Sequence, residues 1–300
     1  MSPRDRRRRP SSASSPNPFP ELGELGAALP ISTGSAMLER ETDGSVTLYV
    51  NGVPSSALHP DPLHLEFEYM RWMQLVVRCW AEEHDAQEMD CAHLGGGGCS
   101  LPRALIAQWE RSRHIVVEKD ELLSQNVRTW FSLPRSPQLR IRVDDAAAAL
   151  ASWRDDRFDV IIRDVFSGNV TPLGLTALET TRHAARVLRD GGIYLVNCAA
   201  PPGTRILADE VATLSSVFPQ VSVIAEPAHL SGKRRGNCVL VASDAPLPLS
   251  VERGLRSDAV SVRLASPSDV RALARGGRII DVRSPAARSS ESVDPSDPAP

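Results

Sequence analysis

The sequence predicts an α/β protein built on a Rossmann-like, mainly parallel sheet of seven strands. From residue 90 onward, apolar strand segments alternate with helical segments, and this order requires helices that cross over between parallel strands. Residues 115–117 and 160–162 are continuously apolar, as expected for strands that are covered on both faces. A run of four glycines follows the first strand, where a nucleotide-binding turn is expected.

Each element is expected from these signals in turn. The strands lie near residues 90–95, 114–119, 139–144, 158–165, 192–198, 221–226 and 237–242. The helices cover about residues 101–110, 120–131, 145–153, 174–189 and 204–217. Gly191 and Gly192 are expected to end the fourth helix, because glycine readily adopts the left-handed conformation found at helix ends. Only a loop separates the last two strands, which predicts that they pair antiparallel.

The glycine run and the acid that follows it predict a nucleoside site. Gly95, Gly96, Gly97 and Gly98 allow positive φ and a close approach of the backbone to a ligand. Glu118 ends the next strand 20 residues after Gly98, where a carboxylate can accept hydrogen bonds from both hydroxyls of a ribose. The combination is more specific than a glycine run alone.

Both ends of the chain are expected to be disordered tails. Residues 1–36 are rich in Arg, Pro and Ser and lack apolar periodicity, and residues 284–300 have the same character. Residues 249–283 show weak periodicity and are expected to form a weakly structured extension.

Between the tails, the chain divides into a small β-element and a large domain. Residues 37–62 are expected to form a β-hairpin element that turns at Asn51 and Gly52, a strong hairpin signal. Residues 63–248 are expected to form the nucleoside-binding domain, and its first helix covers residues 65–82 because the apolar residues there have helical spacing.

Composition argues against several classes of partner. The 300 residues carry a net charge of -3, which argues against nucleic acid as the main partner. No apolar run approaches the roughly 18 to 20 residues that span a membrane, so a cytoplasmic protein without a membrane partner is expected. The cysteines include no Cys-x-x-Cys pair, which indicates reduced thiols and no zinc or other metal site. They are Cys79, Cys91, Cys99, Cys198 and Cys238.

Four acidic residues besides Glu118 lie at strand ends, where ligands bind in such sheets. Asp120 is expected to cap the helix after it rather than to contact a ligand. Asp144 and Asp145 precede a helix, so we expect one to cap it while the other is free to contact a purine amino group. Asp164 interrupts an apolar strand at its carboxyl end. A carboxylate there is costly unless it is solvated or paired, which favours a functional role.

Other reactive residues are interpreted as structural. Cys99 is expected to be a small packed thiol at a helix start, since no histidine partner is evident beyond His93. His93 and His114 lie within or beside apolar strands, where a satisfied core histidine is the usual finding. Residues 233–235, Lys-Arg-Arg, are expected to form a solvated loop.

The order of these features resembles the spermidine synthase family, the polyamine aminopropyltransferases, which share the class I methyltransferase fold. The resemblance covers roughly residues 43–245. Its parts are the amino-terminal β-element, the Gly95-to-Gly98 turn, Val117-Glu118-Lys119-Asp120, Asp144-Asp145-Ala146, the strand ending at Asp164, and Leu188-Arg189-Asp190-Gly191-Gly192. The segment 164–172, Asp-Val-Phe-Ser-Gly-Asn-Val-Thr-Pro, resembles the variant found in the actinobacterial spermidine-synthase-like branch.

The resemblance implies roles for individual residues. Glu118 would bind the ribose, and Asp145 the adenine, of the co-substrate decarboxylated S-adenosylmethionine. Asp164 would help to deprotonate the attacking nitrogen of a small-molecule, polyamine-type amine. Tyr69 matches the tyrosine of a substrate-side motif, and Ser167 stands where an acid would anchor the far ammonium of a diamine. Dimers are common in the resembling family, so a homodimer is an open expectation.

The sequence departs from the family pattern on the substrate side. Gly98 replaces the aspartate that follows three glycines and holds the aminopropyl ammonium, and Ser167 replaces a second aspartate. Tyr69 is followed by Met70 and Arg71 instead of histidine and glutamate. Each missing charge-assisted hydrogen bond is worth about 1.5 to 3 kcal/mol, so weaker substrate binding is expected.

Three functions therefore stay open at this stage. The first is a divergent aminopropyltransferase. The second is an S-adenosylmethionine-dependent methyltransferase, because loss of the acid at position 98 makes room for the carboxylate of that cofactor. Its carboxylate would then bind the backbone amides at a helix start, those of Gly97, Gly98, Cys99 and Ser100. The third is a noncatalytic protein that binds a nucleoside or a partner.

Overall fold

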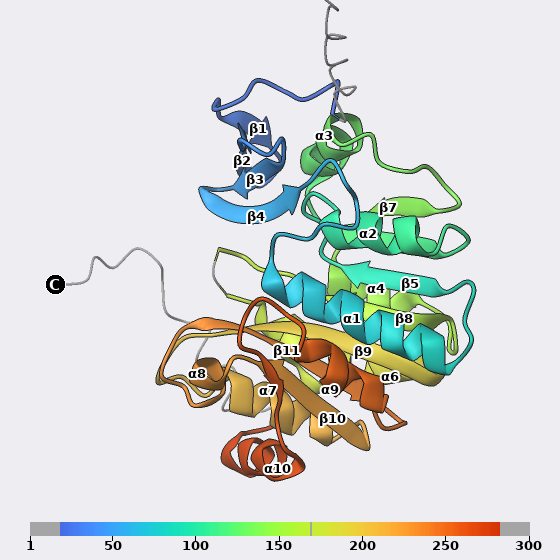
Figure 1. The fold of residues 1–300 in the computed structure, drawn as a ribbon, viewed down its shortest axis with the longest axis vertical. Coiled ribbons are helices and arrows are strands. Elements are labelled where there is room, and N and C mark those ends of the chain that lie inside the picture. Colours follow the sequence, from blue (N-terminus) through green and yellow to red (C-terminus); the bar gives the residue numbers. More distant parts are fainter. Residues whose placement is uncertain (1–18, 169, 283–300) are drawn as a thin grey trace, which may run out of the picture.

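A computed structural model describes residues 19–168 and 170–282, which form a large sheet with helices on both faces and a smaller sheet at one end (Figure 1). The first 18 residues of the tail predicted at 1–36, and the tail predicted at 284–300, lie outside the described residues. In spatial order, the large sheet contains β12 (Arg263–Leu264), β10 (Gln220–Ala225), β11 (Gly236–Ser243), β9 (Leu188–Ala200), β8 (Phe158–Arg163), β5 (Asp90–Leu94), β6 (Arg113–Glu118) and β7 (Leu139–Val143).

The predicted parallel arrangement is confirmed for one side of this sheet. β9, β8, β5, β6 and β7 pair parallel, whereas the three pairings from β9 outward to β12 are antiparallel. The antiparallel pairing expected for β10 and β11 is present. The predicted number of seven strands is wrong by one, because Arg263 and Leu264 pair with Ala225 and Ile224 and extend the sheet.

Helices cover the two faces of the large sheet with separate apolar cores. On one face lie α1 (Glu68–Glu83), α2 (Ser100–Gln108) and α9 (Leu249–Leu255). On the other lie α4 (Ala146–Ser152), α5 (Leu173–Thr176), α6 (Leu178–Val187), α7 (Ile206–Ser215) and α10 (Pro267–Gly276). A third core joins the small sheet to α3 (Glu121–Trp130) and to β6 and β7. None of the helices in the described ranges is long and apolar enough for a membrane span.

The amino-terminal β-element is larger than predicted. It is an antiparallel sheet of β1 (Leu29–Ile31), β2 (Gly34–Arg40), β3 (Val46–Val50) and β4 (Val53–Leu58), in that order. The boundary expected between a tail and a hairpin at residues 36 and 37 is therefore wrong, since it falls inside β2. A strand as short as β1 carries too few residues to show an alternating pattern.

The turn between β3 and β4 agrees with the prediction. Asn51 and Gly52 have φ angles of 51° and 77°, and they connect the paired residues Val50 and Val53. Positive φ at both central residues is the geometry that matches the twist of paired strands, which explains the Asn-Gly sequence.

The extension predicted to be weakly structured is folded over most of its length. α9 packs on α1, and α10 packs on α7. Ser266 and Asp269 form a reciprocal capping box at the start of α10. Beyond this helix, the backbone amide of Ile280 donates to the Thr213 hydroxyl of α7 at 2.9 Å. The prediction was wrong because short elements of this kind depend on packing rather than on strong periodicity.

Gly191 does not end a helix as predicted. α6 stops at Val187, and Leu188 already pairs with Phe158 in the sheet. The register then shifts, because the next aligned pair is Val160 with Ile193, and the extra residues form a bulge. The φ angle of 73° at Gly191 serves this bulge.

Asp120 joins the small sheet to the large domain. Its carboxylate caps α3 by accepting from the Leu123 amide at 2.7 Å, as predicted. It also accepts from the Ser32 amide at 3.0 Å and from the amide and hydroxyl of Thr33, each at 2.7 Å. Burial acts to raise the pKa of Asp120, but these hydrogen bonds outweigh it and the pKa is lowered.

Replacing Asp120 with Ala should therefore lower the free energy of unfolding at neutral pH by about 2 kcal/mol, since a cap is worth roughly 0.5 to 2 kcal/mol and the bonds to the small sheet are lost as well. Urea denaturation measures this, with the exposed Gln125→Ala on the same helix as control. Because the folded pKa is lowered, the stabilisation is complete above the ordinary carboxyl pKa of about 4 and is lost as the pH falls through the folded pKa. A difference between wild type and Asp120→Ala that does not shrink in acid would contradict this account.

Candidate functional site

The structure brings the glycine turn, Glu118 and Asp164 together at the carboxyl edge of the parallel strands. Gly95 follows β5 directly and has a φ of 90°. Its amide donates to the Val117 carbonyl at 2.9 Å, which ties the turn to β6. A Cβ at Gly95 would lie 2.2 Å from the carbonyl oxygen of Asp164, so glycine is needed for the turn to pass the end of β8.

Glu118 accepts hydrogen bonds from three backbone amides. Its Oε2 accepts from Gly96 at 3.1 Å and from Gly97 at 3.3 Å, and its Oε1 accepts from Asp120 at 3.1 Å. The carboxylate is therefore fixed against the glycine turn at the end of β6. Glu118 remains partly exposed.

Gly98 lies against β4 of the small sheet. Its amide donates to the Ser56 hydroxyl at 2.8 Å. A Cβ at this position would meet Leu58 Cδ1 at 2.6 Å and Ser56 Cβ at 2.9 Å. The family aspartate that the sequence lacks at position 98 has no space here, because β4 fills it.

Asp144 and Asp145 follow β7, and one of them caps α4 as predicted. Asp145 is the cap, because its Oδ1 accepts from the amides of Ala147 and Ala148 at 3.0 Å each. Asp144 forms an ion pair with Arg142 at 2.5 Å. The residue that the family resemblance links to adenine is thus the capping one, and an adenine contact from either acid stays a prediction.

Asp164 lies just beyond the end of β8 and accepts hydrogen bonds on both carboxylate oxygens. The Tyr69 hydroxyl of α1 donates to Oδ2, and Nδ2 of Asn197 on β9 donates to Oδ1, each at 2.9 Å. Burial raises the pKa of Asp164, although the bonds from Asn197 and Tyr69 and the charge of Arg163 act to lower it. Burial and the charge of Asp164 raise the pKa of Tyr69 well above its usual value, so this tyrosine remains a neutral donor.

Two of these partners were not identified from the sequence. Asn197 is 2% exposed and stands in the otherwise apolar stretch 193–200 of β9, and that single amide was the signal that could have identified it. Ser56 shows no comparable signal, because it is one of two adjacent serines in β4. Tyr69 was predicted and lies in the site. Ser167 is exposed in the loop after β8, where its amide donates to the Val170 carbonyl at 2.9 Å.

The residues interpreted as structural are buried in the core. Burial raises the pKa of the Cys99 thiol to about 12, which suits a packed thiol and not a nucleophile. His93 Nε2 lies 2.9 Å from His114 Nδ1, and His114 Nε2 lies 2.8 Å from the Ser112 hydroxyl. Burial lowers the pKa of His114 to about 3, so the pair is neutral. All five cysteines are buried free thiols.

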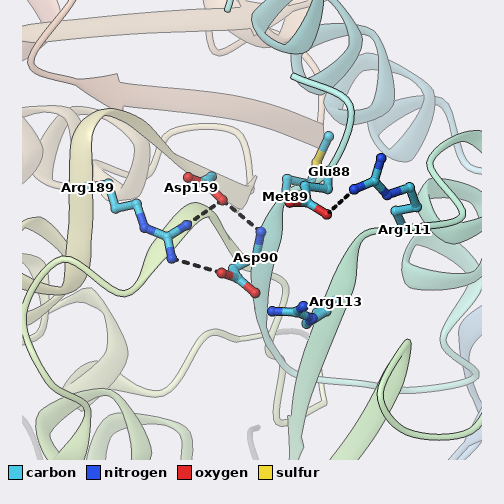
Figure 2. A pocket seen from close by; sticks show the side chains of 7 residues that line it. All are labelled: Glu88, Met89, Asp90, Arg111, Arg113, Asp159 and Arg189. Atoms are coloured by element: carbon cyan, nitrogen blue, oxygen red, sulfur yellow. Dashed lines mark hydrogen bonds and ion pairs between the residues drawn. The ribbon is translucent and has the colours of Figure 1, made fainter. Parts of the chain in front are cut away.

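A polar cavity lies at the opposite edge of the sheet, and ion pairs link several of the residues that line it (Figure 2). The guanidinium of Arg189 lies 2.7 Å from Asp159 and 2.8 Å from Asp90. The Asp90 amide also donates to Asp159 at 2.7 Å, so the bulge of β9 is locked to β8 and β5. This cavity lies at the amino ends of the strands, away from Asp164. Its ion pairs hold β5, β8 and β9 together. In the described ranges, no cluster of three or more His, Cys, Asp or Glu side chains is placed to hold a metal ion.

The fold and the arrangement at the carboxyl edge define a class I methyltransferase-like protein with a glycine turn beside a partly buried carboxylate. A crystal structure of a probable spermidine synthase from Corynebacterium glutamicum is 35% identical in sequence, with a TM-score of 0.81. The match covers 86% of this chain and 97% of that chain. The chain therefore belongs to the spermidine synthase family.

Curated relatives match shorter stretches. A polyamine aminopropyltransferase from Vibrio vulnificus is 28% identical over 127 residues, which are 42% of each chain. An N-terminal histidine N-methyltransferase from Emericella nidulans is 25% identical over 172 residues, 56% of this chain and 30% of the relative. The match spans less than half the length of either curated relative. No protein-family model matches the sequence.

Restoring the family's acid with Gly98→Asp should destabilise the fold instead of repairing the site. The new Cβ meets Ser56 and Leu58, and overpacking of this kind costs about 1 to 3 kcal/mol. The free energy of unfolding measures the effect, and Gly276→Asp, where a side chain meets nothing within 4 Å, serves as control. If Gly98→Asp is as stable as the control variant, β4 does not fill this position.

Proposed function

We propose that this protein transfers an aminopropyl group from decarboxylated S-adenosylmethionine to a small amine. The observation that carries the proposal is the carboxylate of Asp164, held by Tyr69 and Asn197 at the strand end next to the glycine turn. Membership of the spermidine synthase family supports the same reaction class.

The reaction needs an aligned amine and a group that takes its proton. The amine displaces methylthioadenosine from the methylene beside the sulfonium, and because that leaving group departs neutral, little acid catalysis is required. Asp164 can accept the proton that the attacking nitrogen loses. Tyr69 and Asn197 fix both oxygens of this carboxylate, so the base stands in one position relative to the amine.

The residues at the glycine turn fit the nucleoside part of the co-substrate. A carboxylate has about four acceptor positions, and Glu118 uses three for backbone amides, so at least one remains for a ribose hydroxyl. Position 98 offers no acid to the aminopropyl ammonium, so this part of the site does not follow the family pattern.

The occupied amides favour the decarboxylated form over S-adenosylmethionine itself. The methyltransferase hypothesis would place the carboxylate of the cofactor on the amides of Gly97, Gly98, Cys99 and Ser100. The first three of these amides already donate to Glu118, to Ser56 and, at 2.8 Å, to the carbonyl of Gly96. A second anion beside Glu118 would also be repelled. The match to a methyltransferase from Emericella nidulans keeps methyl transfer as the second candidate.

A cytoplasmic location and a homodimer stay predictions from the sequence and the family resemblance. The same holds for the absence of a metal and of a nucleic-acid partner. The acceptor is proposed to be a small-molecule amine of the polyamine type.

Calorimetric titration should show tighter binding of decarboxylated S-adenosylmethionine than of S-adenosylmethionine, because the glycine amides offer no site for a carboxylate. Glu118→Ala should weaken binding of both and of methylthioadenosine by roughly 10-fold to 100-fold, the worth of one hydrogen bond to a charged group. Glu121→Ala, an exposed acid at the start of α3, is the control. A preference for the intact form would favour methyl transfer, and no binding of any of the three would contradict both enzymatic functions.

The pH dependence of aminopropyl transfer tests the role of Asp164. A base works only when deprotonated, so kcat should fall as the pH drops through the raised pKa of Asp164. Asn197→Leu and Tyr69→Phe each remove a donor that favours the charged carboxylate. Either variant should therefore move the acid limb to higher pH by about one unit. Asp164→Asn should reduce kcat by roughly 10²-fold to 10⁴-fold at every pH.

The acceptor amine titrates identically in all these assays, so differences between variants report on the protein alone. Val170→Ala, at an exposed position in the loop after β8, is the control. An acid limb that stays at the wild-type pH in both Asn197→Leu and Tyr69→Phe would show that Asp164 is not the titrating base.

A further inference from the structure

The chain that follows β8 is tied back to this strand by the side chain of Arg163. The backbone of Asp164 still belongs to the sheet, because its amide donates to the Leu94 carbonyl at 2.9 Å. Beyond Asp164 the chain leaves the sheet and continues to α5. There, Nη1 of Arg163 donates to the Leu175 carbonyl at 2.9 Å. The guanidinium therefore links the end of β8 to the helix that comes after Asp164.

The Leu175 carbonyl depends on this bond because α5 is a single short turn. The chain bends at Ala177, whose ψ of 152° separates α5 from α6, so the last carbonyls of α5 cannot all be bound within a helix. Side chains bind them instead. The hydroxyl of Thr180 donates to the Gly174 carbonyl, and Arg163 donates to that of Leu175.

The other terminal nitrogen of Arg163, Nη2, forms a buried ion pair with Glu210 of α7. Each of the two side chains is 3% exposed. Among the described residues, Nε of Arg163 and Oε1 of Glu210 have no hydrogen-bond partner. The cost of removing two charges from water is offset only when the remaining polar atoms are satisfied, so apolar side chains of similar size would stabilise the fold about as well. Stability alone therefore does not account for the pair.

Two titratable side chains of β9 face the ion pair. Arg163 is aligned with Val196, and Tyr194 and Cys198 lie two residues to either side on the same face of the sheet. Burial raises the pKa of Tyr194 to about 12 and that of Cys198 well above its usual value, so both are neutral. Neither of them competes as an ion for Arg163 or Glu210.

The carboxyl-terminal segment after α10 joins α7 to the corner between α5 and α6. On α7, the Asp209 carboxylate accepts from the Arg278 amide at 2.7 Å. The Thr213 hydroxyl accepts from the Ile280 amide at 2.9 Å. The Ile280 carbonyl in turn accepts from the amide of Leu178, the first residue of α6, at 2.7 Å. The two elements that the guanidinium binds are thus fixed relative to one another.

We propose that Glu210, acting through Arg163, positions Asp164 for the reaction. Glu210 holds the guanidinium, and the guanidinium holds α5 at the end of β8, so the backbone is fixed on both sides of the Asp164 carboxylate. This inference rests on the proposed function, because it takes Asp164 as the base. Arg163 and Glu210 lie on the face of the sheet opposite to Tyr69, so they act through the backbone and not on the amine.

Replacement of the whole pair, Arg163→Met together with Glu210→Leu, tests the proposal without leaving a buried charge. The melting temperature should stay at the wild-type value or rise. Hydrogen exchange of α5, measured by mass spectrometry, should become roughly 10-fold to 100-fold faster, the worth of one hydrogen bond to a charged group. Exchange of α3 should not change. This measurement requires no turnover.

In an aminopropyl transfer assay, the double variant should lower kcat by roughly 10-fold to 100-fold, as expected for a misplaced base, and leave the affinity for methylthioadenosine unchanged. Arg163→Lys keeps a cation beside Glu210 but lacks the second nitrogen, which binds the Leu175 carbonyl. It should lower kcat at every pH by a similar factor, while the acid limb of the pH profile stays in place. Arg189→Met breaks ion pairs at the opposite edge of the same sheet and is the control that should keep kcat.

An unchanged exchange rate of α5, or an unchanged kcat, in the double variant overturns the proposal. If that variant does not fold, a wild-type kcat in Arg163→Lys overturns it. A loss of kcat in Arg189→Met as large as in the double variant does so too, since any weakened ion pair of the sheet would then suffice. Hydrogen exchange separates these outcomes from failure of the proposed function. Faster exchange of α5 in a protein whose wild type transfers no aminopropyl group leaves Arg163 and Glu210 as residues that fix the end of β8, and removes the proposed reaction.

Discussion

The site depends on one constraint, which is that the glycine turn passes very close to two other segments. At one end of the turn, Gly95 is so near the carbonyl of Asp164 that any side chain would push β8 away. At the other end, Gly98 touches Ser56 and Leu58 of the small sheet. The glycine turn, the carboxylate of Asp164 and the amino-terminal sheet therefore fix one another's positions. A shift in any of the three would move the others.

The position of Asp164 also depends on how its charge is stabilised. Burial of a carboxylate disfavours the charged form, and two hydrogen bonds to a charged group, each worth about 1.5 to 3 kcal/mol, offset much of that cost. The preceding residue, Arg163, points to the opposite face and bonds to Glu210 and to the Leu175 carbonyl. Consecutive residues at the end of β8 are thus anchored on both faces of the sheet, which limits the freedom of the carboxylate.

Much of this architecture could be predicted from sequence pattern because its elements are long and covered on both faces. The parallel strands, their crossover helices, the Asn51 turn and the cap at Asp120 all have local signals. β1 and β12 do not, since strands of three and two residues form only where a neighbouring strand supplies their hydrogen bonds. Gly191 was misassigned for a related reason, because positive φ serves a bulge as well as a helix end.

The acidic residues of the site could be predicted from the sequence, whereas its neutral hydrogen-bond donors could not. Glu118 and Asp164 stand out because a carboxylate at the end of an apolar strand is costly, whereas an asparagine inside such a strand is less conspicuous. Asn197 acquires its role only when β9 pairs beside β8, which a linear pattern does not reveal.

Ser56 and β4 determine what surrounds position 98. Its hydroxyl occupies the amide of Gly98, and β4 fills the space of a side chain there. Under the proposed function, the small sheet thus leaves position 98 with neither an acid for the ammonium of the co-substrate nor a free amide for a carboxylate. Selectivity would then come from the exclusion of a carboxylate and from the charge of Asp164. This arrangement is consistent with a chain that keeps the glycine turn but not the aspartate after it.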